Sequence, residues 1–192
     1  RIGTYGLLVT MQEMIARNCT VGEVDSVTGP TIGRPKSATF RTLDVVGLDT
    51  FAHVAKNVYD KTTGEEQAVF EESPILNKMI ANGWIGAKSG QGFFKKEGKE
   101  ILELNLSTFE YEPAKKLKAP SLEMAKQAKG LGNRVKTLVY ANDRVGELLW
   151  NIFAPTLIYS AQLSGEIADD ILAIDNAMKW GFGWQQGPFE IW

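Results

Sequence analysis

Apolar residues recur at intervals of three and four along two segments in the first third of the chain, residues 2–17 and 40–59. This spacing places them on one face of a helix, so it predicts two buried amphipathic helices. Gly47 lies inside the second segment and can divide that helix in two. The apolar positions are Ile2, Leu8, Met11 and Ile15 in the first segment, and Phe40, Leu43, Val46, Phe51, Val54 and Val58 in the second.

Capping signals mark two shorter helices between and after these segments. Thr20 followed by Glu23 fits a capping box, and Gly29-Pro30 ends the short helix that it opens. Ser73-Pro74 combines an N-cap with proline in the first turn, and Asn82-Gly83 provides the matching end.

The pattern changes to strand-like segments near the middle of the chain. Residues 92–96 and 100–104 flank Glu97-Gly98-Lys99, which predicts a short β-hairpin and the only sheet of the protein. Residues 105–120 carry two prolines and three lysines with little periodicity, so we expect a linker.

Helical patterns return after residue 120. Ser121 is expected to cap a polar helix that ends near residue 129, and a long apolar helix follows through residues 135–153. Pro155 should kink or restart that helix, because proline removes one of its hydrogen bonds. A last helix is expected over residues 167–179.

Two features recur at an offset of 150 residues. Asp25 and Gly33 in the first half correspond to Asp175 and Gly183 in the second. In both halves a short helix, a glycine-rich loop and a phenylalanine follow a long helix, which indicates duplication of one helical unit. We therefore expect a first unit over residues 1–104, a linker over 105–120 and a second, partial unit over 121–192.

Composition and charge exclude several classes of function. Lys and Arg number 21 against 23 Asp and Glu, so the chain has no overall positive field to attract nucleic acid or an anionic membrane. No apolar run reaches the roughly 18–20 residues that a membrane span needs. Cys19 and His53 are the only residues of their kinds, which leaves no set of ligands for a zinc site and no Cys-His pair.

Glycine-rich stretches at residues 83–89, 90–92 and 181–183 do not fit the fingerprints of nucleotide-binding loops. The first lacks glycine directly before its Lys-Ser pair, and the other two lack the third glycine of a dinucleotide fold. The sequence therefore predicts no cofactor-binding, catalytic or metal-binding residue in this chain.

Several residues allow both a structural and a functional interpretation. We interpret His53 as a structural or surface histidine rather than a catalytic base. We interpret Cys19 as an inert thiol rather than a nucleophile. The lysines of the linker can be solvated or can contact a phosphate. The aromatic stretch Trp180–Trp184 either fills a core between helices or lines an apolar pocket.

Residues 28–50, which include Gly33-Arg34-Pro35, resemble the C-terminal helical domain of 3-hydroxyacyl-CoA dehydrogenases. A second stretch is similar to that family as well. It comprises residues 73–79 and 86–94. The second of these ranges resembles the family's closing signature, which consists of lysine, Ser/Thr, glycine, any residue, glycine, phenylalanine and an aromatic residue.

The second half, residues 134–192, resembles the partial repeat of long multifunctional members, with the family's Gly-Pro-Phe ending at residues 187–189. The first half departs from that ending and has Ser37-Ala38-Thr39-Phe40 instead.

The resemblance implies an all-α fold like the C-terminal domain of 6-phosphogluconate dehydrogenase, duplicated, with one small β-hairpin. It also implies that the parent protein oxidises (S)-3-hydroxyacyl-CoA to 3-ketoacyl-CoA in fatty-acid β-oxidation. A preceding Rossmann domain would bind NAD and supply a His-Glu pair. Arg1 resembles the arginine of the family's Asn-Arg pair, and the chain begins without Met, so we expect an excised piece of a cytoplasmic enzyme that is inactive alone.

Three residues are candidates for contact with the acyl-CoA substrate: Arg34, Pro35 and Phe40, all in the loop and helix start of the first unit. The alternative for them is a loop that packs on its own core. The resemblance also implies a homodimer and contact with the Rossmann domain, and it allows a fused enoyl-CoA hydratase domain. The competing hypothesis is a noncatalytic helical scaffold that keeps the fold and lacks the site.

Overall fold

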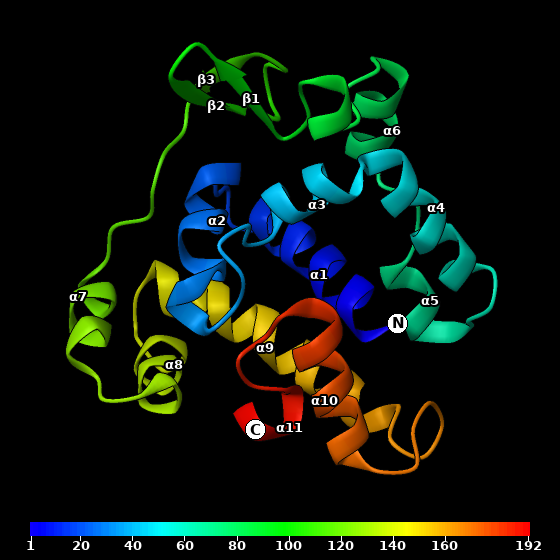
Figure 1. The fold of residues 1–192 in the computed structure, drawn as a ribbon, viewed down its shortest axis with the longest axis vertical. Coiled ribbons are helices and arrows are strands. Elements are labelled where there is room, and N and C mark those ends of the chain that lie inside the picture. The colour runs from blue at the N-terminus through cyan, green and yellow to red at the C-terminus, as the bar shows by residue number, and fades with distance from the viewer.

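A computed structural model describes residues 1–192 as an assembly of helices with one small sheet at its edge (Figure 1). Two long helices, α1 (Ile2–Ala16) and α9 (Arg144–Gln162), pack against each other at the centre. The Tyr5 ring of α1 stacks on the Tyr159 ring of α9 with their centroids 4.0 Å apart. This contact joins the first half of the chain to the second.

The first half surrounds α1 with short helices, and their ends follow the local signals in the sequence. These are α2 (Val21–Thr28), the 3-10 helix η1 (Pro30–Ile32), α3 (Phe40–Val46), α4 (Leu48–Tyr59), α5 (Gly64–Val69) and α6 (Pro74–Ala81). The predicted capping box at Thr20 and Glu23 is present, and the Ser73 hydroxyl accepts a hydrogen bond from the Leu76 amide at the start of α6. Gly47 separates α3 from α4 with a φ of 96°, which glycine adopts without strain. Helix α5 was not predicted.

The sheet is larger than the predicted hairpin. Strands β1 (Phe94–Glu97) and β2 (Glu100–Leu104) pair in antiparallel register, with Phe94 opposite Glu103. A third strand, β3 (Tyr111–Pro113), pairs with β2 and lies within the segment predicted as a linker. The predicted hairpin of β1 and β2 is confirmed. The prediction missed β3, because this strand depends on pairing with β2 and shows little pattern of its own.

Residues after β3 run along one edge of the molecule to the second half (Figure 1). This half contains α7 (Pro120–Gln127), α8 (Leu131–Val139), α9, α10 (Ile171–Phe182) and α11 (Pro188–Ile191). The predicted long helix through residue 153 is divided before α9, where the Asp143 carboxylate accepts hydrogen bonds from Val145 and Gly146. Ser121 does not cap α7, because its amide and hydroxyl donate to Asp143 instead.

Pro155 neither ends nor restarts α9, which continues through it to Gln162. The buried side of α9 carries Ile152, Phe153 and Thr156 around this position, so packing against α1 holds the helix together despite the missing hydrogen bond. No helix of the protein combines the length and the apolar character needed to cross a bilayer.

Candidate functional site

A cavity of about 350 Å³ lies where the two halves meet. Its walls come from the start of α1, the loop between η1 and α3, helix α3, and the segment at the end of α10. No acidic side chain lines it, and one lining side chain, that of Arg34, carries a charge. The lining residues are Gly3, Gly6, Leu7, Arg34, Pro35, Ser37, Ala38, Thr39, Thr42, Val46, Gly181, Phe182 and Trp184.

Arg34 is the most unusual side chain of this cavity. It is 9% exposed, and its Nε and Nη2 atoms are buried without a hydrogen-bond acceptor. The guanidinium carbon lies 4.3 Å from the centre of the Trp184 ring and 5.4 Å from that of Phe153. Burial lowers the pKa of Arg34 to about 10, so the group keeps its charge at neutral pH. A buried cation held by two rings and no carboxylate is the main electrostatic feature here.

The contact between Arg34 and Trp184 joins equivalent positions of the two repeats. Both residues directly follow a glycine in the left-handed conformation, Gly33 with a φ of 74° and Gly183 with a φ of 66°. The two loops also share a backbone hydrogen bond, from the Gln185 amide to the Gly33 carbonyl at 2.8 Å. The repeat found in the sequence therefore corresponds to two similar loops that meet at one point.

One carboxylate in each half holds the helix that follows its loop. Asp25 accepts hydrogen bonds from the amides of Thr39, Phe40 and Arg41 at the start of α3. Asp175 accepts in the same way from the amides of residues 189 and 190 in α11. Burial raises the pKa of Asp25 to about 7, against the lowering effect of the three amides. These bonds fix the loop that carries Arg34.

The three predicted substrate contacts lie in different places. Arg34 and Pro35 line the cavity. Phe40 is fully buried and packs against Phe93 with ring centroids 4.7 Å apart, so its side chain belongs to the core of the first unit. Its position on α3 points the side chain inward, which agrees with the alternative of packing on the core of its own unit.

Buried Asp44 explains two glycines of the second stretch that resembles the family, Gly86 and Gly92. Its carboxylate accepts from the amides of Phe93 and Phe94, both at 2.8 Å. A side chain at Gly86 or Gly92 would collide with Asp44, which explains why glycine is needed at both positions. Gly86 lies against the backbone of Asp44 and Gly92 against its carboxylate, and an acidic group at this point does not fit the phosphates of a dinucleotide. The residues present here therefore do not fit NAD.

Arg1 connects the start of α1 to both halves. Its guanidinium pairs with Glu66 at 2.6 Å and with Glu166, and its Nε donates to the Tyr159 hydroxyl at 3.3 Å. Tyr159 in turn donates to Glu66. The cluster therefore holds the start of α1 against both halves of the chain.

Part of the aromatic stretch at the end of α10 lines a cavity, which is one of its two predicted roles. Phe182 and Trp184 line the cavity, whereas Trp180 is 80% exposed. Sequence reasoning missed Trp184 as the partner of Arg34. The offset of 150 residues could have identified it, because Arg34 and Trp184 hold equivalent positions in the two repeats.

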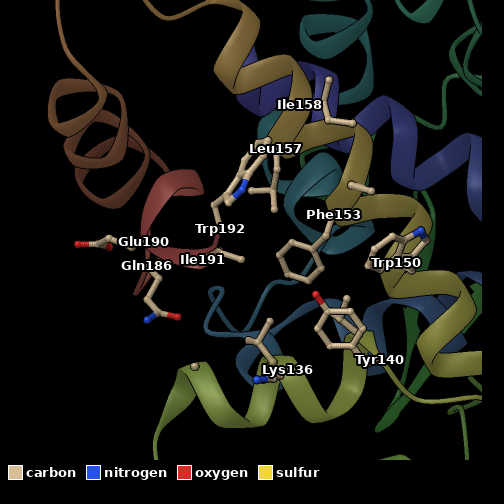
Figure 2. Close-up of a pocket in the computed structure, with 14 residues that line it drawn as sticks. Lys136, Tyr140, Trp150, Phe153, Leu157, Ile158, Gln186, Glu190, Ile191 and Trp192 are labelled. Carbon is tan, nitrogen blue, oxygen red and sulfur yellow. The ribbon is translucent and has the colours of Figure 1, made fainter.

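A second cavity of about 510 Å³ lies between α8, α9 and α11 (Figure 2). Phe153 lies between Tyr140 and Trp150 on one side and Ile191 and Trp192 on the other. The groove is mostly apolar, with Lys136 and Glu190 as its charged side chains. It holds no buried, unpaired polar group comparable to Arg34.

The other candidate residues of the sequence lie outside both cavities. His53 is exposed on α4. Cys19 is buried, and burial raises the pKa of its thiol, which disfavours the reactive thiolate. Lys115 is paired with Glu112 at 2.7 Å on the surface.

Comparison with known proteins identifies relatives of one kind. Residues 4–96 match the family model of the 3-hydroxyacyl-CoA dehydrogenase C-terminal domain. A probable 3-hydroxyacyl-CoA dehydrogenase of Bacillus subtilis is 66% identical over 192 residues, which are 100% of this chain and 24% of that protein. One from Deinococcus radiodurans is 44% identical over 108 residues, covering 56% of this chain and 31% of that protein.

A more distant relative is a putative fatty acid oxidation complex trifunctional enzyme of Rickettsia prowazekii. It is 25% identical over 197 residues, which cover 100% of this chain and 26% of that protein. The chain thus spans about a quarter of the length of the curated relatives that it matches along its whole length.

Proposed function

Residues 4–96 of this chain belong to the family of 3-hydroxyacyl-CoA dehydrogenase C-terminal domains, and from that premise we propose that the chain forms the substrate-binding part of such an enzyme. The reaction is the oxidation of (S)-3-hydroxyacyl-CoA to 3-ketoacyl-CoA with NAD as the hydride acceptor. The observation that carries the proposal is the match over residues 4–96, which includes α1, Arg34 and the glycines around Asp44.

In the proposed division of labour, another domain binds NAD and performs proton abstraction. The helices described here shape the acyl site and exclude water from it. Arg34 and Pro35 line the cavity at the junction of the two halves, and the Arg1 cluster holds the adjacent end of α1.

Association with a further domain or a second copy is supported by apolar side chains on the surface. Val45 and Val46 at the end of α3 are 69% and 47% exposed, and Leu172 and Trp180 on α10 are 61% and 80% exposed. Exposed apolar side chains that form a patch commonly mark a surface that contacts another protein or domain. We propose that these faces contact the cofactor-binding domain or form the dimer, and the trifunctional relative supports a fused hydratase as a further partner.

A replacement experiment tests the proposed function. In the Bacillus subtilis relative, the 192 matching residues are exchanged for this chain, and NADH oxidation is measured with acetoacetyl-CoA. We expect the hybrid to retain activity, and we expect neither this chain alone nor the relative without these residues to show any. The unmodified relative serves as the positive control.

A hybrid that folds and remains inactive beside an active relative would contradict the proposal. Circular dichroism and gel filtration distinguish this outcome from simple misfolding. Such a result would favour the noncatalytic helical scaffold, which shares the fold and requires no functional acyl site.

A further inference from the structure

Arg34 carries a charge in a place where the protein offers it no counterion. Buried arginines are normally paired with a carboxylate, because an unpaired charge away from water is costly. No acidic side chain lies within ion-pair distance of Arg34, and its Nε and Nη2 donors have no acceptor. The rings of Trp184 and Phe153 offset part of this cost through their π faces. They provide no hydrogen-bond acceptor for the N–H groups that lie in the plane of the guanidinium.

The surroundings fix the guanidinium in position. Trp184 lies 4.3 Å from it, and the loop carrying Arg34 is tied to the Trp184 loop by the hydrogen bond between Gln185 and Gly33. Pro35 directly follows Arg34 and restricts the backbone. The cation is therefore held in one place before any ligand arrives, which reduces the entropy lost on binding.

The rest of the cavity complements a small group with a negative charge. Its lining contains no carboxylate that would repel an anion. The hydroxyls of Thr39 and Thr42 are already hydrogen-bonded within the protein. Thr39 donates to the Thr28 hydroxyl, whereas Thr42 donates to the Ala38 carbonyl and pairs with the Ser37 hydroxyl. A volume of about 350 Å³ is enough for a carboxylate or phosphate together with a short apolar segment, which Leu7, Val46 and Phe182 would contact.

We propose that this cavity is an anion site in which the guanidinium of Arg34, which has no counterion, binds a carboxylate or phosphate group. Ion pairs of a guanidinium with such a group are stronger than neutral hydrogen bonds. The inference rests on the geometry of the cavity, and it stands whether or not the chain takes part in a dehydrogenase. Coenzyme A is one source of such a group, through its phosphates, and a short acyl chain with a terminal carboxylate is the other.

Trp184 provides a direct readout, because it contacts the guanidinium. Its indole N–H resonance is assigned in the NMR spectrum by its loss in the Trp184→Phe variant. The 192-residue chain is then titrated at constant ionic strength with inorganic phosphate, 3′,5′-ADP, coenzyme A and glutarate. We expect saturable shifts of this resonance with a Kd below about 1 mM for at least one probe. Binding of 3′,5′-ADP and coenzyme A would identify the phosphate source, and binding of glutarate the carboxylate source.

Two variants separate Arg34 from the general charge of the loop. Arg34→Met keeps the length of the side chain, and we expect it to weaken binding at least tenfold. Lys36→Met removes an exposed cation of the same loop and should leave the Kd unchanged. Arg34→Lys keeps the charge and loses the planar fork, so its affinity should be intermediate.

The proposal is overturned if no probe shifts the Trp184 resonance saturably, or if Arg34→Met binds as tightly as the unchanged chain. An equal loss of binding in Lys36→Met would also overturn it, because it would indicate a diffuse effect of surface charge. Exchanging a buried, unpaired charge for a similar apolar side chain is commonly neutral or stabilising. Thermal unfolding of Arg34→Met therefore verifies that a loss of binding does not arise from unfolding.

Discussion

Asp25 and Asp175 hold equivalent positions in the two repeats, and replacing each by alanine tests how much these carboxylates stabilise the fold. Removing the Asp25 carboxylate leaves three backbone amides without their acceptor, at Thr39, Phe40 and Arg41. Thr39 and Phe40 are 1% and 0% exposed, so water cannot replace the lost acceptor there. Each buried, unsatisfied donor costs about 1–3 kcal/mol, which gives a loss of about 2–6 kcal/mol for Asp25→Ala.

The matched variant Asp175→Ala should cost less. It frees two amides, and these belong to a partly buried residue and an exposed one, Phe189 and Glu190. Water can reach these amides, so we expect a loss of about 1–2 kcal/mol. Both aspartates lie within helices, α2 and α10, so the gain in helix propensity from alanine is similar and cancels in the comparison.

The assay is urea denaturation followed by circular dichroism at 222 nm. It is performed at pH 5, because burial raises the pKa of Asp25 to about 7 and the contribution of this carboxyl to stability is lost as the pH rises through that value. We expect the midpoint of Asp25→Ala to fall clearly below that of Asp175→Ala, with similar slopes. Equal losses, or a larger loss for Asp175→Ala, would show that the burial of the amides does not control the energy and would refute the reasoning.

Two further predictions concern the walls of the cavity and a buried carboxyl. Gly3→Ala should be less stable than Gly6→Ala by about 1–3 kcal/mol in thermal unfolding, because a Cβ at Gly3 would overlap the Phe182 ring, whereas one at Gly6 would have 3.6 Å to its nearest neighbour; equal stabilities would contradict this. Burial raises the pKa of Asp44 to about 6, so its contribution to stability is present below about pH 4 and is lost as the pH rises to 6. The slope is at most about 1.4 kcal/mol per pH unit, and NMR titration of the Phe93 amide should report the same pKa; a pKa near 4 would contradict it.

The sequence by itself determined the elements whose signals are local. The capping box at Thr20, the proline start at Ser73-Pro74 and the division at Gly47 all appear where they were predicted, because each depends on residues within one turn of the helix. The repeat was also visible, since it relates residue types at a fixed offset. The resemblance to a known family came from two such local motifs.

Only the tertiary structure decided the features that depend on distant partners. Strand β3 exists because it pairs with β2, and α9 continues through Pro155 because it packs on α1. Phe40 was a candidate for substrate contact and is core instead, since its orientation depends on where α3 packs. Arg34 is unusual because of residues about 120 and 150 positions away, Phe153 and Trp184. Sequence patterns record propensity and periodicity, whereas burial and electrostatic environment are set by which segments meet in space.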